Sequence, residues 1–115
     1  MSAANAMTDQ NQRRTMRKRS LLSGKIAYHE GSFTLSCTIR DISEGGARVK
    51  IPNGQILPTM VFLIDVREGC AYDACTKWQS KTEAGLEFRQ KIKLDVNCPE
   101  EYRYLRRILI EALPR

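Results

Sequence analysis

Two short stretches of the sequence combine residue types that bind anionic, hydrogen-bonding ligands. The first is RRTMRKRS, residues 13–20, in which five basic side chains fall within seven positions. An arginine can donate two hydrogen bonds to a phosphate, bind the O6 and N7 acceptors of guanine, or stack on a base. This stretch alone fits either a general attraction to polyanions or one half of a specific pocket, so the other half must be sought elsewhere in the chain.

The second stretch, RDISEGGAR at residues 40–48, has more polar chemistry than a tight turn needs. Asp41 and Ser43 are two residues apart, so their side chains point to the same side if the chain is extended there. Gly45 and Gly46 lack a Cβ, which permits a positive φ and lets a ligand approach the backbone closely. A turn formed by an aspartate and two glycines is the simpler interpretation, and it is favoured for this stretch taken alone.

The carboxylate in the second stretch favours recognition of a base in addition to phosphate charge. Asp41 can accept the N1–H and exocyclic N–H donors of guanine, whereas a carboxylate beside a phosphate repels it. Ser43 can donate to a phosphate or bond a base edge, and Gly46 leaves room for a ring system. Arginine suits such a site better than lysine, because lysine is a point charge without a planar fork.

Strand and helix patterns indicate the elements that position these two stretches. Apolar runs and alternating patterns typical of β-strands occur at residues 24–28, 33–39, 47–51, 60–66, 72–78 and 84–88. Apolar side chains then recur at helical spacing, which predicts a helix over residues 97–113 with Pro99 at its first position and Asn97 or Cys98 as its cap. Six short strands followed by one amphipathic helix predict a mostly β fold, a small barrel closed by the helix.

Length and charge predict one globular domain with a basic arm. The 115 residues suffice for a single modest core, and 42% hydrophobic with 28% charged residues is ordinary for a globular protein. Residues 1–20 hold five basic residues and one acidic residue (+4), whereas the rest of the chain holds 14 and 12 (+2). We expect a disordered tail at 1–12 and a domain over 13–115, with the basic arm at 13–20 and the barrel at 21–91.

The remaining residue types favour a cytoplasmic protein without catalysis. No apolar run approaches the roughly 18 residues of a membrane span, and no signal peptide is evident. The four cysteines lack a C-x-x-C pair and the single histidine, His29, is far from them in sequence. We therefore predict free cysteines in the core or in strands, His29 in a solvated turn, and no metal site. No nucleophile has an evident base partner, so we expect neither enzymatic activity nor a cofactor.

Together, the two stretches resemble the PilZ domain family, whose members are receptors for the bacterial second messenger cyclic di-GMP. The first matches the family's R-x-x-x-R pattern and the second its D-x-S-x-x-G pattern, in the family's order. The residues that these patterns assign to the ligand are Arg13, Arg17, Asp41, Ser43 and Gly46. Residues of a second tier are Arg14, Lys18, Gly45 and Arg48. Arg14 and Lys18 are also four apart, but only the register of Arg13 and Arg17 keeps both members arginine.

The resemblance covers nearly the whole folded chain, from Arg13 through the C-terminal helix. It implies a six-stranded antiparallel barrel with a flanking C-terminal helix. TKW, which ends at Trp78, and GLEF at residues 85–88 are also similar to the family. We interpret Trp78 as a packing residue, because a lone tryptophan at strand spacing is more often that than a platform for a base. The resemblance further implies that the basic arm is flexible when empty and folds across the barrel around the nucleotide.

The leading hypothesis is a stand-alone cyclic di-GMP receptor that changes shape and then acts on a downstream protein, in motility, biofilm formation or a related bacterial process. One alternative is a PilZ-like interaction module without ligand binding, against which the intact motif residues count. Another is a nucleic-acid binder that works through the basic arm. The nearly neutral body and the lack of interleaved surface aromatic residues count against that alternative.

Overall fold

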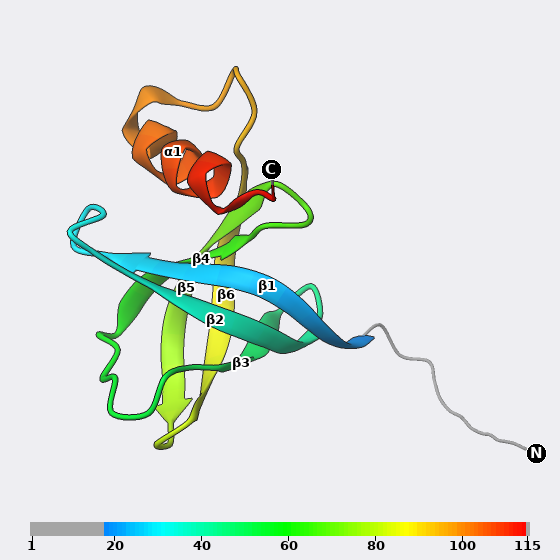
Figure 1. Ribbon diagram of the computed structural model, residues 1–115, viewed down its shortest axis with the longest axis vertical. Helices are drawn as coiled ribbons and strands as arrows, with labels where there is room; N and C mark the ends of the chain where they lie inside the picture. Colours follow the sequence, from blue (N-terminus) through cyan, green and yellow to red (C-terminus); the bar gives the residue numbers. More distant parts are fainter. Residues whose placement is uncertain (1–17, 115) are drawn as a thin grey trace, which may run out of the picture.

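The computed structural model describes residues 18–114, which form a closed barrel with an α-helix over one end (Figure 1). The strands are β1 (Lys18–Tyr28), β2 (Phe33–Ile42), β3 (Gly46–Lys50), β4 (Met60–Asp65), β5 (Cys70–Gln79) and β6 (Glu83–Lys93). A 3-10 turn, η1 (Glu100–Tyr102), leads into α1 (Arg103–Ala112). Neighbouring strands are antiparallel in the order β1-β2-β3-β6-β5-β4, and β1 pairs with β4 to close the barrel. The predicted six-stranded antiparallel barrel with a C-terminal helix is confirmed.

Several strands extend beyond their predicted bounds. β6 continues to Lys93 because its polar second half still pairs with β5, with Lys91 opposite Tyr72. β1 begins at Lys18, which lies opposite Ile42 of β2, so residues 18–20 of the predicted arm belong to the barrel. The predicted tail at 1–12 lies outside the described residues. Polar side chains on an outer face interrupt the apolar pattern without interrupting the hydrogen-bonded ladder.

The predicted start of the helix is wrong. Pro99, which was expected at the first helical position, is the extended residue before η1, with φ −56° and ψ 148°, and no side chain caps that turn. Cys98 donates its backbone N–H to the carbonyl oxygen of Asp95 instead of capping a helix. A proline disfavours the helical conformation in the residue before it, here Cys98, and Pro99 itself is extended, so the helical segment begins at Glu100. No helix in the described part of the chain is long and apolar enough to cross a membrane.

Two hydrophobic clusters hold these elements together. The first fills the interior of the barrel with inward-facing residues of the strands, among them Ile26, Ile39, Val49 and Leu63. The second packs Leu105 and Leu109 of α1 against Ala27, Ile64 and Ala71 at one end of the barrel. Alternation along each strand sends one set of side chains into the first cluster and leaves the other set on the outer face.

The β1–β2 turn lies near Tyr104 of α1, at the same end of the barrel as the helix (Figure 1). Its residues His29, Glu30 and Gly31 have positive φ angles of 53°, 57° and 88°. A Cβ on Gly31 would lie 2.8 Å from Cδ2 of Tyr104, so glycine is required both by the backbone conformation and by the ring of the helix. His29 is exposed in this turn, as predicted.

The four cysteines are free thiols. Cys37, Cys70 and Cys98 are buried, and Cys75 is half-buried in β5. Burial raises the pKa of Cys37 to about 12 and also raises the pKa of Cys70. Both thiols therefore stay protonated at neutral pH, which makes them poor nucleophiles and poor metal ligands. The predicted placement of the cysteines in the core and in strands is confirmed.

The docking of α1 gives a test of the second cluster. Leu105 is fully buried between α1 and the barrel, so Leu105→Ala should lower the free energy of unfolding by about 2–5 kcal/mol. Ile110→Ala in the same helix is the matched control. Ile110 is 49% exposed, and its truncation should cost less than about 1 kcal/mol. Urea unfolding followed by circular dichroism measures both values, and equal losses would contradict the docking through Leu105.

Candidate ligand-binding site

A β-bulge in β2 turns two neighbouring charged side chains to the outer face. The pairing of β2 with β3 shifts between Ile39 and Asp41, so Arg40 has no partner residue on β3. In a regular strand Arg40 and Asp41 would point to opposite faces. The extra residue bends the strand and changes the direction of the side chains. Ile39 and Ile42 both pack against the barrel core, while Asp41 turns outward to Arg48 of β3.

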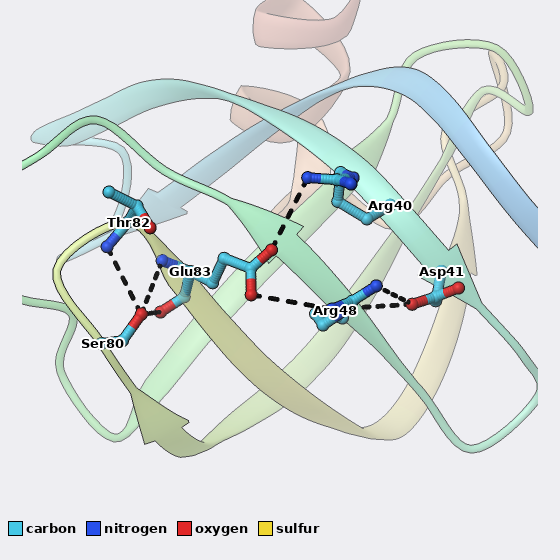
Figure 2. A network of polar contacts seen from close by, with 6 residues as sticks. All are labelled: Arg40, Asp41, Arg48, Ser80, Thr82 and Glu83. Atoms are coloured by element: carbon cyan, nitrogen blue, oxygen red, sulfur yellow. Dashed lines mark hydrogen bonds and ion pairs between the residues drawn. The ribbon is translucent and has the colours of Figure 1, made fainter.

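Four charged side chains alternate in sign along this face, in the order Asp41, Arg48, Glu83, Arg40 (Figure 2). Arg48 places Nε and Nη2 at 2.8 and 2.7 Å from Oδ2 of Asp41. Its Nη1 lies 3.7 Å from Oε1 of Glu83, and the other oxygen of Glu83 lies 3.7 Å from Nη1 of Arg40. Asp41 is only 6% exposed, so the short contacts with Arg48 supply the partner that a buried carboxylate requires.

The β5–β6 turn holds Glu83 at the start of β6. Ser80 donates its backbone N–H to the carbonyl oxygen of Glu83 at 2.8 Å. The hydroxyl oxygen of Ser80 accepts the backbone N–H groups of Glu83 at 3.1 Å and of Thr82 at 3.4 Å (Figure 2). Glu83 lies two residues from Gly85, which is opposite Arg48, so its side chain shares the outer face with Arg48.

The β2–β3 turn contains the polar motif. β2 ends at Ile42, so Ser43 lies beyond the extended segment in which it would share a side with Asp41. Ser43 donates its backbone N–H to the carbonyl oxygen of Gly46 at 2.9 Å, and its Oγ donates to the same oxygen at 3.4 Å. The carbonyl oxygen of Gly45 accepts the N–H of Phe88 at 2.8 Å. The turn is therefore closed on itself and tied to β6.

The two glycines of this turn have different roles. Neither uses the positive φ that the sequence analysis allowed for. The described glycines with a positive φ are Gly31, Gly54 and Gly69. A Cβ on Gly46 would collide with the carbonyl oxygen of Leu86 on β6, whereas a Cβ on Gly45 would have no atom within 4 Å. Gly46 is therefore required by the packing of two strands, and Gly45 leaves open space beside the turn.

A hollow of about 440 Å³ opens beside this turn. Its wall on the motif side includes Ser43, Gly45, Gly46 and Arg48. Its wall on β5 and β6 includes Lys77, Trp78, Gly85 and Glu87. Trp78 is 47% exposed and lies opposite Gly85, and a Cβ on Gly85 would overlap the indole. The glycine therefore lets the indole lie against β6, with much of the ring accessible to a ligand.

The structure brings together part of the predicted site. Four of the predicted residues line the hollow: Ser43, Gly45, Gly46 and Arg48. Asp41 does not line it and is joined to its wall through Arg48. Lys18 begins β1 opposite Ile42, next to the end of β2. The residues Arg13, Arg14 and Arg17 lie outside the described part of the chain.

The wall formed by β5 and β6 was not predicted from the sequence. Trp78 was interpreted as a packing residue, whereas the structure shows that it covers Gly85 and also lines the hollow. A glycine inside a strand pattern marks a place where another group approaches the backbone closely. Gly85, together with the register of the β5–β6 hairpin, would have indicated the contact between Trp78 and the backbone of β6. Lys77 and Glu87 of the same wall form an ion pair at 3.6 Å, which no sequence signal indicated.

The groups around the hollow suit an anion that carries an aromatic ring. The exposed indole of Trp78 offers a face for stacking, which is worth about 1–3 kcal/mol per base in nucleic-acid complexes. Arg48 and Lys77 supply cationic donors that are each already paired with a carboxylate, and the hydroxyl of Ser43 supplies a donor when it leaves its long contact with the Gly46 carbonyl oxygen. Asp41 behind Arg48 is an acceptor for N–H groups. This arrangement can bind a nucleotide, and no group in it is placed as a nucleophile with a base.

A second hollow, of about 470 Å³, lies along α1 and has simpler chemistry. Arg103, Arg106 and Arg107 line it and make no ion pair within the described residues. Val96 and Ile110 beside them are exposed aliphatic side chains. The hollow offers positive charge without an aromatic face, so the site beside the β2–β3 turn is the better candidate for a nucleotide.

The contrast between the two glycines is testable through stability. Gly46→Ala should lower the free energy of unfolding by about 1–3 kcal/mol, because its methyl group would press on the Leu86 carbonyl oxygen. Gly45→Ala is the matched control and should stay within about 0.5 kcal/mol of the original protein. Denaturant unfolding of the two variants measures both changes. A larger loss in Gly45→Ala than in Gly46→Ala would contradict this assignment.

Comparison with known proteins agrees with this geometry. The family model of the PilZ domain matches residues 11–109. No curated protein and no solved structure matches the chain significantly. The matched range contains the basic stretch, every strand of the barrel, both walls of the hollow and most of α1. Because this match spans well over half of the sequence, the chain belongs to the PilZ domain family.

Proposed function

We propose that this protein is a receptor for cyclic di-GMP and that the ligand binds in the hollow between the β2–β3 turn and Trp78. Membership of the PilZ family supports the class of ligand, because the family is one of cyclic di-GMP receptors. The observation that carries the proposal is local. Ser43, Gly45, Gly46 and Arg48 line one wall of the hollow, and the exposed indole of Trp78 and the cationic Lys77 line the other.

The proposed contacts follow from the chemistry of the two guanines and two phosphates. Trp78 stacks on one base, and the open side of Gly45 lets the ring system approach the turn. Asp41 accepts the N1–H and exocyclic N–H groups of guanine. Ser43 and Arg48 donate to phosphate oxygens or to the base edge, with the contacts to phosphate strengthened by charge.

The basic arm is proposed to complete the site. β1 begins at Lys18, and Arg19 pairs in register with Asp41, so the chain enters the barrel beside the motif. Arg17 directly precedes Lys18 in the sequence, and Arg13 lies four residues before Arg17. We propose that residues 13–17 fold over the nucleotide, with the entropy lost on ordering offset by charge-assisted hydrogen bonds. Arg14 is the second-tier contact of this segment.

We propose that ligand binding signals by changing the surface of this protein and not by catalysis. Ordering of residues 13–17 would alter the face of the barrel that a downstream protein contacts, so the chain would act as an adaptor. We propose that this adaptor works in the cytoplasm. The intact motif residues count against an interaction module without a ligand, because contact with a protein does not require Asp41 and Ser43 at this spacing. A nucleic-acid binder would use the charge of the arm but would not need Asp41 beside it. The ligand-binding measurements below distinguish the receptor from both alternatives.

Competition between cyclic dinucleotides tests whether the site recognises guanine. Cyclic di-AMP carries the same two charges, but adenine presents the wrong donors and acceptors to arginine and Asp41. Each mismatched base contact costs about 1–3 kcal/mol, so cyclic di-AMP should displace labelled cyclic di-GMP at least about tenfold less well. Arg17→Lys should also weaken binding because the planar fork is lost. Arg67→Lys is its control, because Arg67 does not line the hollow.

Equal displacement by cyclic di-AMP, or by an oligonucleotide of mixed sequence, would contradict a guanine-specific receptor. In that case the binding should also fall steeply with salt, as the release of counterions from a polyanion requires. No measurable binding of cyclic di-GMP would favour the interaction module instead.

NMR relaxation tests the proposed ordering of the arm. The backbone amides of residues 13–17 should be mobile on the picosecond–nanosecond scale without ligand and ordered at saturation with cyclic di-GMP. The amides of Lys18 and Arg19 serve as the internal control, because these two residues already pair with β2 and should change little. An arm with high order parameters before the ligand is added would refute the order–disorder switch.

A further inference from the structure

The carboxylate of Asp41, which is proposed to bind guanine, already forms a short ion pair in this structure. Arg48 contacts Oδ2 of Asp41 through Nε at 2.8 Å and through Nη2 at 2.7 Å. Only 8% of the Asp41 side chain is exposed, and Asp41 does not line the hollow. Both Arg48 contacts are made to Oδ2, so a guanine that pairs its N1–H and exocyclic N–H with both oxygens of Asp41 has to take the place of Arg48 on Oδ2.

Arg48 has a second carboxylate within reach. Its Nη1 lies 3.7 Å from Oε1 of Glu83, which is an ion-pair distance but too long for a good hydrogen bond. A small rotation of the Arg48 side chain, which is 37% exposed, would shorten this contact into a charge-assisted hydrogen bond. The same rotation would release Asp41. Glu83 is contacted from the other side by Arg40, so two arginines share one carboxylate (Figure 2).

We infer that Glu83 is a positioning residue for the nucleotide: it receives Arg48 when guanine takes the place of Arg48 on Asp41. This inference rests on the proposed function. The exchange leaves neither charged group without a hydrogen-bond partner, because Asp41 gains the neutral N–H donors of guanine as it loses Arg48, and Arg48 gains Glu83 as it loses Asp41. Leaving a buried carboxylate without a partner is the costly alternative. Arg40 opposes the exchange, because it competes with Arg48 for Glu83.

Plain charge attraction predicts effects of the opposite sign. Cyclic di-GMP carries two negative phosphates, so removing the negative charge of Glu83 should tighten binding, and removing the positive charge of Arg40 should weaken it. The exchange predicts the reverse for both residues. Glu83→Gln leaves Arg48 without a second charged acceptor and keeps it on Asp41, which weakens binding. Arg40→Ala frees Glu83 for Arg48, which tightens binding.

Isothermal titration calorimetry with cyclic di-GMP at moderate salt separates the two accounts. Since partly exposed ion pairs have modest strength, Glu83→Gln should weaken binding about two- to fivefold, and Arg40→Ala should tighten it by a similar factor. Glu87→Gln is the matched control. It removes the same charge from the same strand beside the hollow, but Glu87 pairs with Lys77 and not with Arg48. This control should tighten binding, because it removes a negative charge beside the ligand and frees Lys77, so weaker binding by Glu83→Gln isolates the effect on Arg48.

Tighter binding by Glu83→Gln together with weaker binding by Arg40→Ala would overturn the exchange while leaving the receptor function intact. Absence of binding by the unaltered protein would instead reject the receptor function itself. The NMR resonance of the Arg48 Nε–Hε group provides a second, direct test of the exchange. It should shift on saturation with cyclic di-GMP in the unaltered protein, and an unchanged resonance in the saturated complex would also overturn the exchange.

Discussion

The ion pair between Asp41 and Arg48 is the contact on which the rest of the site depends. It joins β2 to β3 on the outer face, and it exists because the bulge at Arg40 turns Asp41 away from the interior. In a regular strand the carboxylate would enter an apolar core without a partner, which is strongly unfavourable. The pair also fixes Arg48 in the wall of the hollow, directly beside the turn that contains Gly46.

The opposite wall depends on the register of two further strand pairs. Gly85 lies opposite Arg48 in the β3–β6 pair and opposite Trp78 in the β5–β6 pair. A larger residue there would displace the indole, so the glycine sets the distance between the aromatic ring and the cationic side chain of Arg48. The site therefore contains a row of three residues on three neighbouring strands: the charged Arg48, Gly85 without a side chain, and the aromatic Trp78.

The sequence predicted those structural features whose interacting residues lie close together in the chain. Alternating and helical periods revealed the strands and α1, and the motif turn could be found because its residues lie within one short stretch. Trp78 and Glu83 were not assigned to the site, because only the strand order of the closed barrel brings β5 and β6 beside β3. The bulge at Arg40 is a single extra residue, which alternation does not reveal, and the polar outer face of β6 concealed its length.

The strand order divides the barrel into two consecutive meanders, β1-β2-β3 and β4-β5-β6. The meanders meet along two seams, β3–β6 and β1–β4, which pair residues far apart in the chain. Contacts of this kind form late in folding, because a long loop must close before they contribute. The motif turn belongs to one meander and Trp78 to the other, so the hollow comes into existence only when the β3–β6 seam closes. A nucleotide bound there would bridge the two halves and shift the folding equilibrium toward the closed barrel.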